Sequence, residues 1–225
     1  VHKEVFTPGN AAMLLIDHQV GTTSWTNSHS IAEIKRNALS LARIATAFKM
    51  PLVLTSSMEG EIQGPLLPEL EKIAPEAFAQ RIQRAGIVNA MHDENFNKAV
   101  KATGRKKVIV AGITTEVCVV FPVLQLLDEG YEVQVVTDAY ASFTKTGDDA
   151  ALRRMEQAGA IITSTSQIIS ELAVDWTTPH GQALQKILLR SQPFTRLAGV
   201  GFRWSRAMAG YKLGKLIPGR RGQAG

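Results

Sequence analysis

The stretch KKVIVAGITTEVCVVFPVLQLL, Lys106 to Leu127, indicates the fold more clearly than any other part of the chain. It begins with β-branched and small apolar residues, is interrupted at Gly112, and continues through two threonines and a glutamate to Cys118. A second apolar run follows, with the composition of a buried helix. The pattern predicts a buried strand, a short turn and a helix, with the only cysteine of the chain at the start of that helix.

Short apolar segments and stretches with helical spacing alternate along the rest of the chain. Continuous apolar runs are typical of strands covered on both faces, and hence of a parallel sheet. The expected strands are residues 11–17, 51–57, 106–112 and 131–138, with a weaker one at 160–164 and a possible sixth at 84–89. The expected helices are residues 30–49, where Ser30 and Glu33 would form a capping box, 93–104 and 144–159. This order predicts a three-layer α/β/α sandwich with a mainly parallel, Rossmann-like sheet.

Charge is distributed unevenly along the 225 residues. The formal net charge is +5, but nine of the 25 basic residues follow Asp175, the last acidic residue, which leaves 16 basic against 20 acidic residues before that point. Residues 191–225 contain seven glycines, seven basic residues and no acid. We therefore expect one domain over residues 1–190 and a basic, glycine-rich C-terminal arm over residues 191–225.

The arm allows two interpretations. Its basic and aromatic residues could bind nucleic acid or an anionic membrane surface. Its glycine content favours an oligomerisation segment or a mobile tail, so nucleic acid is not an expected partner. No apolar run approaches the roughly 20 residues that a membrane-spanning helix needs. A single cysteine excludes an internal disulfide, and no signal peptide precedes the first apolar run, so we expect a cytoplasmic protein.

Two reactive groups follow predicted strands. Asp17 ends the first strand, and Cys118 follows the strand 106–112 by one turn. If these strands are neighbours at the point where strand order reverses, carboxylate and thiol converge in one cleft. With Thr115 as N-cap, Cys118 would be the third helical residue, where the helix dipole lowers a thiol pKa, and Pro122 would loosen this turn. The alternative is that Cys118 is a small buried hydrophobe and Asp17 a loop anchor.

A third observation favours the catalytic interpretation. LLIDHQ, GPLLPEL, RAGIVNAMHDENF, AGITTEVCV and VTDAYAS occur in an order that resembles the isochorismatase-like cysteine hydrolase family, especially its YcaC-like branch, over roughly residues 5–190. The resemblance implies a triad in which Asp17 is the general acid/base and Cys118 the nucleophile. It also implies a cis peptide bond at Ile113–Thr114 and an oxyanion hole formed by the backbone N–H groups of Thr114 and Cys118.

The third triad position departs from the family's commonest pattern. Arg84 stands where the family usually has lysine, and an arginine can stabilise thiolate and carboxylate but does not release a proton at working pH. Proton transfer would then fall to Asp17 alone. Two alternatives remain at this point: Arg84 pairs with a surface carboxylate, or Arg81, one helical turn away, fills the position.

The resemblance implies a hydrolase acting on a small molecule, which we expect to cleave an amide-like or carbamoyl C–N bond through a thioester. The alternatives are an isochorismate-type vinyl ether hydrolase and a non-catalytic, redox-responsive thiol protein. No cofactor is expected, and no metal, because the histidines are scattered and the D-x-H pair of metal-dependent relatives is absent. A homo-oligomer, tetramer or octamer, is the expected assembly.

Overall fold

The computed structural model describes residues 5–191, so the predicted arm, apart from Ser191, lies outside the described residues. Six strands form one sheet in the order β3-β2-β1-β4-β5-β6, and all five pairings are parallel. The strands are β1 (Ala11–Ile16), β2 (Leu52–Ser57), β3 (Ile82–Arg84), β4 (Lys107–Gly112), β5 (Glu132–Val136) and β6 (Ile161–Thr163). The order reverses between β1 and β4, as in a Rossmann-like sheet, which confirms the predicted fold class.

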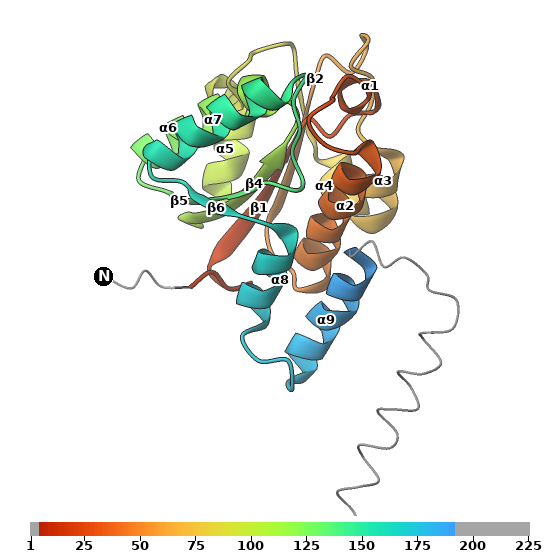
Figure 1. Ribbon diagram of the computed structural model, residues 1–225, viewed down its shortest axis with the longest axis vertical. Coiled ribbons are helices and arrows are strands. Elements are labelled where there is room, and N and C mark those ends of the chain that lie inside the picture. The colour runs from red at the N-terminus through yellow and green to blue at the C-terminus, as the bar shows by residue number, and fades with distance from the viewer. Residues whose placement is uncertain (1–4, 192–225) are drawn as a thin grey trace, which may run out of the picture. The chain divides into compact units, whose positions relative to one another are not determined.

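Helices cover both faces of the sheet (Figure 1). They are α1 (Val20–Ser24), α2 (Ile31–Ala47), α3 (Pro68–Ile73), α4 (Pro75–Ala79), α5 (Glu94–Ala102), α6 (Val120–Asp128), α7 (Lys145–Gln157), α8 (Thr165–Ala173) and α9 (Pro179–Ser191), with a short 3-10 turn, η1 (Ala90–His92), and a π-turn, η2 (Thr115–Val119). Each of them is too short or too polar to span a bilayer, within the described part of the chain.

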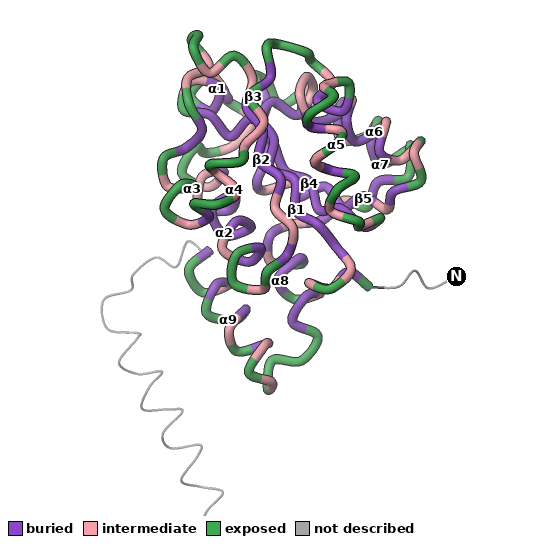
Figure 2. The backbone as a smooth tube through the Cα atoms, turned by 180° about the vertical axis from the view of Figure 1, so that it is seen from behind, coloured by how far each residue is buried: buried purple, intermediate pink, exposed green. Residues whose placement is uncertain are grey.

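The central strand β1 shows why the layers form. Its six residues are all buried, and successive side chains point to opposite faces. Ala11, Met13 and Leu15 pack with α2, α3, α8 and α9, whereas the intervening residues pack with α5, α6 and α7. The tube in Figure 2 shows this buried sheet enclosed by helices whose outer faces are exposed. A strand buried on both faces needs apolar residues at every position, which is the pattern that the sequence has.

Three details differ from the prediction. The sixth strand was expected at 84–89, but β3 ends at Arg84, because only three residues pair with β2 before the chain turns at Gly86, which has φ +115°. Ser30 does stand at the N-cap of α2, but its side chain makes no capping hydrogen bond, so no capping box forms. Helices α1, α3, α4, α8 and α9 have no counterpart among the predicted elements.

Candidate active site

The carboxyl ends of β1 and β4 lie side by side. Ile16 pairs with Gly112 at the last position of their register, so the residues that follow both strands emerge at the same edge of the sheet. Asp17 comes directly after β1, and Cys118 lies on the π-turn that follows β4. The two groups are close enough for each to influence the pKa of the other. The structure thus brings the carboxylate and the thiol to the same edge of the sheet.

Asp17 is held in a buried, defined position. Its backbone has φ 55°, a left-handed conformation that turns the chain sharply at the end of β1. Its N–H donates to the Thr55 carbonyl on the neighbouring strand at 2.9 Å. Oδ2 accepts a hydrogen bond from Arg84 Nη2, whereas Oδ1 is buried and has no partner among the described residues. One carboxylate oxygen is thus fixed by the arginine and the other is available for proton transfer.

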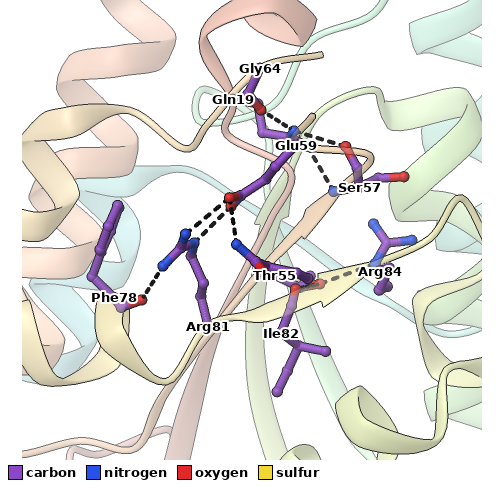
Figure 3. A network of polar contacts seen from close by, with 10 residues as sticks. Gln19, Thr55, Ser57, Glu59, Gly64, Phe78, Arg81, Ile82 and Arg84 are labelled. Carbon is purple, nitrogen blue, oxygen red and sulfur yellow. Dashed lines mark hydrogen bonds and ion pairs between the residues drawn. The ribbon is translucent and has the colours of Figure 1, made fainter. Parts of the chain in front are cut away.

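Arg84 is the arginine that contacts Asp17. It is only 2% exposed, which excludes the alternative of a surface ion pair. Besides Asp17, its guanidinium donates to Thr55 Oγ1 from Nε at 3.0 Å and to the Ile87 carbonyl from Nη1. Arg81 instead forms two hydrogen bonds with Glu59, at 2.7 and 2.9 Å, on the other side of the strand (Figure 3). Arg81 therefore does not fill the third position.

Cys118 lies on a π-turn rather than in the first turn of an α-helix. Thr114, not Thr115, is the N-cap residue, so the predicted cap is wrong by one position. The Thr114 carbonyl accepts hydrogen bonds from the N–H groups of Val117, Cys118 and Val119, at 3.2, 2.8 and 3.2 Å. Helix α6 starts only at Val120, and its third residue is Pro122. Cys118 as a residue is partly exposed.

The expected lowering of the thiol pKa is wrong. The pKa of Cys118 is raised to about 12, chiefly by burial and then by the charge and hydrogen bond of Asp17, whereas Arg84 and the backbone at Thr114 have smaller, lowering effects. Burial also raises the pKa of Asp17, against the opposing effects of Arg84 and Cys118. The resting pair is therefore a neutral thiol beside a carboxylate that accepts a proton more readily than an exposed one.

The backbone around Thr114 has the shape that the family resemblance implies. The peptide bond between Ile113 and Thr114 is cis. The N–H of Thr114 donates no hydrogen bond among the described residues, whereas the N–H of Cys118 is bonded to the Thr114 carbonyl. Of the two predicted oxyanion donors, one is thus free in this structure and the other is engaged.

Two polar residues that the prediction left without a role hold the end of β1. His18 is fully buried and bonds through Nε2 to the Ala139 carbonyl at 2.9 Å, and burial lowers its pKa to about 4. Gln19 bonds to both backbone groups of Ser57 and to the Gly64 carbonyl (Figure 3). The sequence does contain a signal for this role, because three consecutive polar residues, Asp17 to Gln19, follow a fully apolar strand. No group of three potential metal-ligating side chains occurs within residues 5–191.

Comparison with known proteins agrees with this geometry. The model of the Isochorismatase domain matches residues 11–167, a range that includes Asp17, Arg84 and Cys118. The chain belongs to the isochorismatase family. It is 43% identical over 167 residues to the probable hydrolase YcaC of Escherichia coli K12, covering 74% of this chain and 79% of the relative.

Two solved structures of this family have the same fold. YcaC from Pseudomonas aeruginosa, solved with hexane-2,5-diol and covalent acrylamide, has a TM-score of 0.81 and 38% identity over 94% of this chain and 99% of its own. YcaC from Escherichia coli, described as an octameric hydrolase of unknown specificity, has the same TM-score and 37% identity over 95% of this chain and 98% of its own. The isochorismatase fold of the described domain is thus shared with these relatives over nearly their full length.

Proposed function

We propose that this isochorismatase-family protein is a cysteine hydrolase that cleaves an amide-like or carbamoyl C–N bond of a small molecule through a thioester. The observation that carries the proposal is the buried Asp17–Arg84 pair beside a partly exposed Cys118, at the edge where β1 and β4 end. A thiol, a carboxylate and a fixed positive charge are the parts that nucleophilic acyl transfer needs.

In the first step the Cys118 thiol loses its proton to Asp17 as the sulfur attacks the carbonyl carbon. Since the thiol pKa is about 12, a free thiolate is rare at rest, and proton transfer accompanies the attack. The Asp17 carboxylate suits this role because burial raises its pKa while Arg84 holds its other oxygen. Arg84 keeps its own proton and stabilises the negative charge that moves between sulfur and carboxylate.

The backbone of the π-turn supplies the donors for the oxyanion. We propose that the N–H groups of Thr114 and Cys118 bind the developing negative charge. The Thr114 group is free, and the Cys118 group must turn from the Thr114 carbonyl toward the substrate. That carbonyl keeps its bonds from Val117 and Val119, so the change leaves no backbone oxygen unsatisfied.

The remaining steps use the same carboxyl group. Protonated Asp17 gives its proton to the nitrogen as the C–N bond breaks, which releases an amine and leaves an acyl group on sulfur. Asp17 then takes a proton from water, and the hydroxide attacks the thioester carbon. Collapse of this intermediate breaks the C–S bond, and Asp17 returns the proton to the sulfur. Each cycle thus consumes one water and restores both groups.

The relatives support the proposal in two respects. Acrylamide is an electrophile that thiolates attack, and its covalent presence in the Pseudomonas aeruginosa protein suits a reactive thiol in this family.

The Escherichia coli relative is an octamer, and we propose that this chain forms a homo-oligomer, tetramer or octamer, as well. A neighbouring subunit would help to enclose the partly exposed residue Cys118.

The test is a screen of small amides, carbamates and ureas with the wild type and with Cys118→Ala. The variant should lose turnover, because no other cysteine exists in the chain, while its circular dichroism and unfolding midpoint stay close to those of the wild type. A trapped acyl adduct, detected by mass spectrometry on the wild type alone, would identify the thioester. Equal turnover by both proteins would end the nucleophile assignment.

A second candidate is isochorismate-type vinyl ether hydrolysis, which needs an acid but no thiol. The raised pKa of Asp17 is the observation that favours it, since such a carboxyl group takes up a proton more readily and can then donate it. Iodoacetamide separates the two candidates: alkylation of Cys118 stops thioester chemistry by removing the nucleophile. Retained turnover of a vinyl ether by Cys118→Ala would favour the second candidate.

A further inference from the structure

The side chain of Glu116 lies against the start of helix α7. Glu116 is the second residue of the π-turn, two positions before Cys118. A Cβ atom on Gly147, in the first turn of α7, would lie 1.8 Å from Oε2 and 2.5 Å from Cδ of Glu116. The carboxylate therefore fills the space that any side chain at position 147 would need. Its Oε2 is buried without a hydrogen-bond partner among the described residues, so close packing fixes this contact.

Gly147 has no other reason to be glycine. Its φ lies outside the left-handed region, and its N–H donates to the N-cap Thr144 Oγ1 at 3.1 Å, as a residue of any type would do there. Within a helix, alanine is more favourable than glycine. What glycine provides at this position is space for the Glu116 carboxylate. That negative group also lies near the positive end of the dipole of α7, which favours it electrostatically.

The π-turn is attached on its other side by its backbone. Thr115 N–H donates to the Ala141 carbonyl at 3.0 Å, and Glu116 N–H donates to Ser142 Oγ at 3.4 Å. The Glu116 side chain is thus one contact of this turn with α7, and Cys118 lies on the same turn. Glu116 and Cys118 are two positions apart on this turn of five residues.

We propose that Glu116 is a positioning residue for Cys118, with its carboxylate seated on Gly147. The proposal rests on the proposed role of Cys118 as nucleophile. A misplacement of about 1 Å in a reacting group can lower a rate by about 100-fold, so this remote contact has a catalytic consequence. Neither Glu116 nor Gly147 exchanges protons with substrate or touches the reacting atoms in this scheme.

The first arm of the test is Gly147→Ala. The added methyl group displaces the Glu116 carboxylate, and turnover should fall by about 10- to 100-fold. Alkylation of Cys118 by iodoacetamide, in which the thiolate displaces iodide, is a substrate-free second readout. Its rate at a fixed, mildly alkaline pH should change by at least about threefold, because the thiolate fraction depends on the positions of Asp17 and Arg84.

The second arm is rescue. In Glu116→Ala/Gly147→Ala the carboxylate is gone, the methyl group has room, and both rates should return to those of Glu116→Ala alone. Gly9→Ala is the matched control, since a Cβ there would meet only Thr7 Oγ1 at 3.8 Å and the residue precedes β1 at the opposite edge of the sheet. If Glu116 had only a structural role, Gly147→Ala would have a lower unfolding midpoint, but the alkylation rate of Cys118 in the folded variant would equal that of the wild type.

Two results would overturn the positioning role. One is a Gly147→Ala protein with wild-type turnover and alkylation, and the other is a loss that removal of Glu116 does not relieve. If Gly147→Ala does not fold, Glu116→Ala alone decides: its alkylation rate should differ from that of the wild type, and an equal rate rejects the proposal. Alkylation needs no substrate, so failure here is distinct from failure of the hydrolase assignment, which Cys118→Ala tests.

Discussion

The ends of β1 and β4 lie next to each other, but they are stabilised by different forces. After β1, Asp17 is fixed by Arg84 and by one backbone hydrogen bond to Thr55, in a buried and charged environment. After β4, Gly112 allows close contact with the neighbouring strand, and Cys118 follows on a turn that is placed by packing. Asp17 is thus held mainly by a buried ion pair, whereas the turn that carries Cys118 is held by packing and by backbone hydrogen bonds.

This difference means that the two groups can be disturbed separately. A change of charge or pH should act at the end of β1, where buried ionisable groups are concentrated. An added methyl group should act at the end of β4, where a Cβ would collide with neighbours. The following variants test this division, beginning with the largest expected effect.

Asp17→Asn should lower turnover but raise the rate at which Cys118 is alkylated. Turnover should fall by at least about 100-fold, because the general base and acid is lost. Alkylation of Cys118 by iodoacetamide should become faster at a mildly alkaline pH, because the negative neighbour that raises its pKa is gone, although burial, the larger cause, remains. Parallel kinetic and mass-spectrometric assays measure both rates. Slower alkylation of a folded variant would contradict the assigned geometry.

Arg84→Ala tests the charge pairing itself. It leaves a buried carboxylate without its partner, and breaking such a pair costs about 3–5 kcal/mol in free energy of unfolding. Arg81→Ala is the matched control, because its ion pair with Glu59 is partly exposed, and pairs of that kind contribute about 1 kcal/mol or less. Urea unfolding of both variants at neutral pH gives the comparison. Equal losses would mean that the end of β1 is not held by charge.

His18 makes the stability of the same region depend on pH. The folded protein holds this histidine neutral, with a pKa of about 4 against an ordinary 6.5. As the pH falls, the unfolded chain binds a proton at His18 before the folded protein does. The contribution of His18 to the free energy of unfolding is therefore complete above about pH 6.5 and is lost as the pH falls toward 4. The total loss is about 3 kcal/mol. The Cys118 thiol does not titrate in this range.

The measurement is urea unfolding as a function of pH for the wild type and His18→Gln. Glutamine retains an N–H that can donate to the Ala139 carbonyl but carries no titratable group. The difference between the two pH profiles isolates His18 from the carboxylates that titrate in both proteins. Parallel profiles would show that burial of this histidine does not contribute to acid destabilisation.

The sequence predicts the sheet and the meeting of Asp17 with Cys118, because both depend on patterns local to one strand. A continuous apolar run defines a strand, and a parallel sheet brings strand ends to one edge. It does not predict the pKa of Cys118, because that value depends on burial by distant segments. The position of Cys118 in the chain suggests a helix N-terminus, but the observed π-turn delays α6 until Val120.

Arg84 and Glu116 show the same limit at the level of single side chains. The family resemblance places Arg84 at the third position, but only the structure distinguishes it from Arg81, since both lie at the β3 edge. Glu116 is polar and adjoins the nucleophile, yet nothing local indicates that it faces Gly147, more than 30 residues later. Contacts between distant segments are set by packing, which periodicity does not encode.

Gly112→Ala is the steric counterpart of Arg84→Ala and has the smallest expected effect on stability. A Cβ at position 112 would lie 2.8 Å from the Ile16 carbonyl oxygen and from Val119 Cγ2, between β1 and the π-turn. Overpacking of this kind costs about 1–3 kcal/mol, and this loss should be the same at each pH because no ionisable group is involved. Gly60→Ala is the control, since no atom lies within 4 Å of a Cβ there. A loss that varied with pH in the range where His18 titrates would show that packing after β4 and charge after β1 are coupled, and the division between the two strand ends would have to be given up.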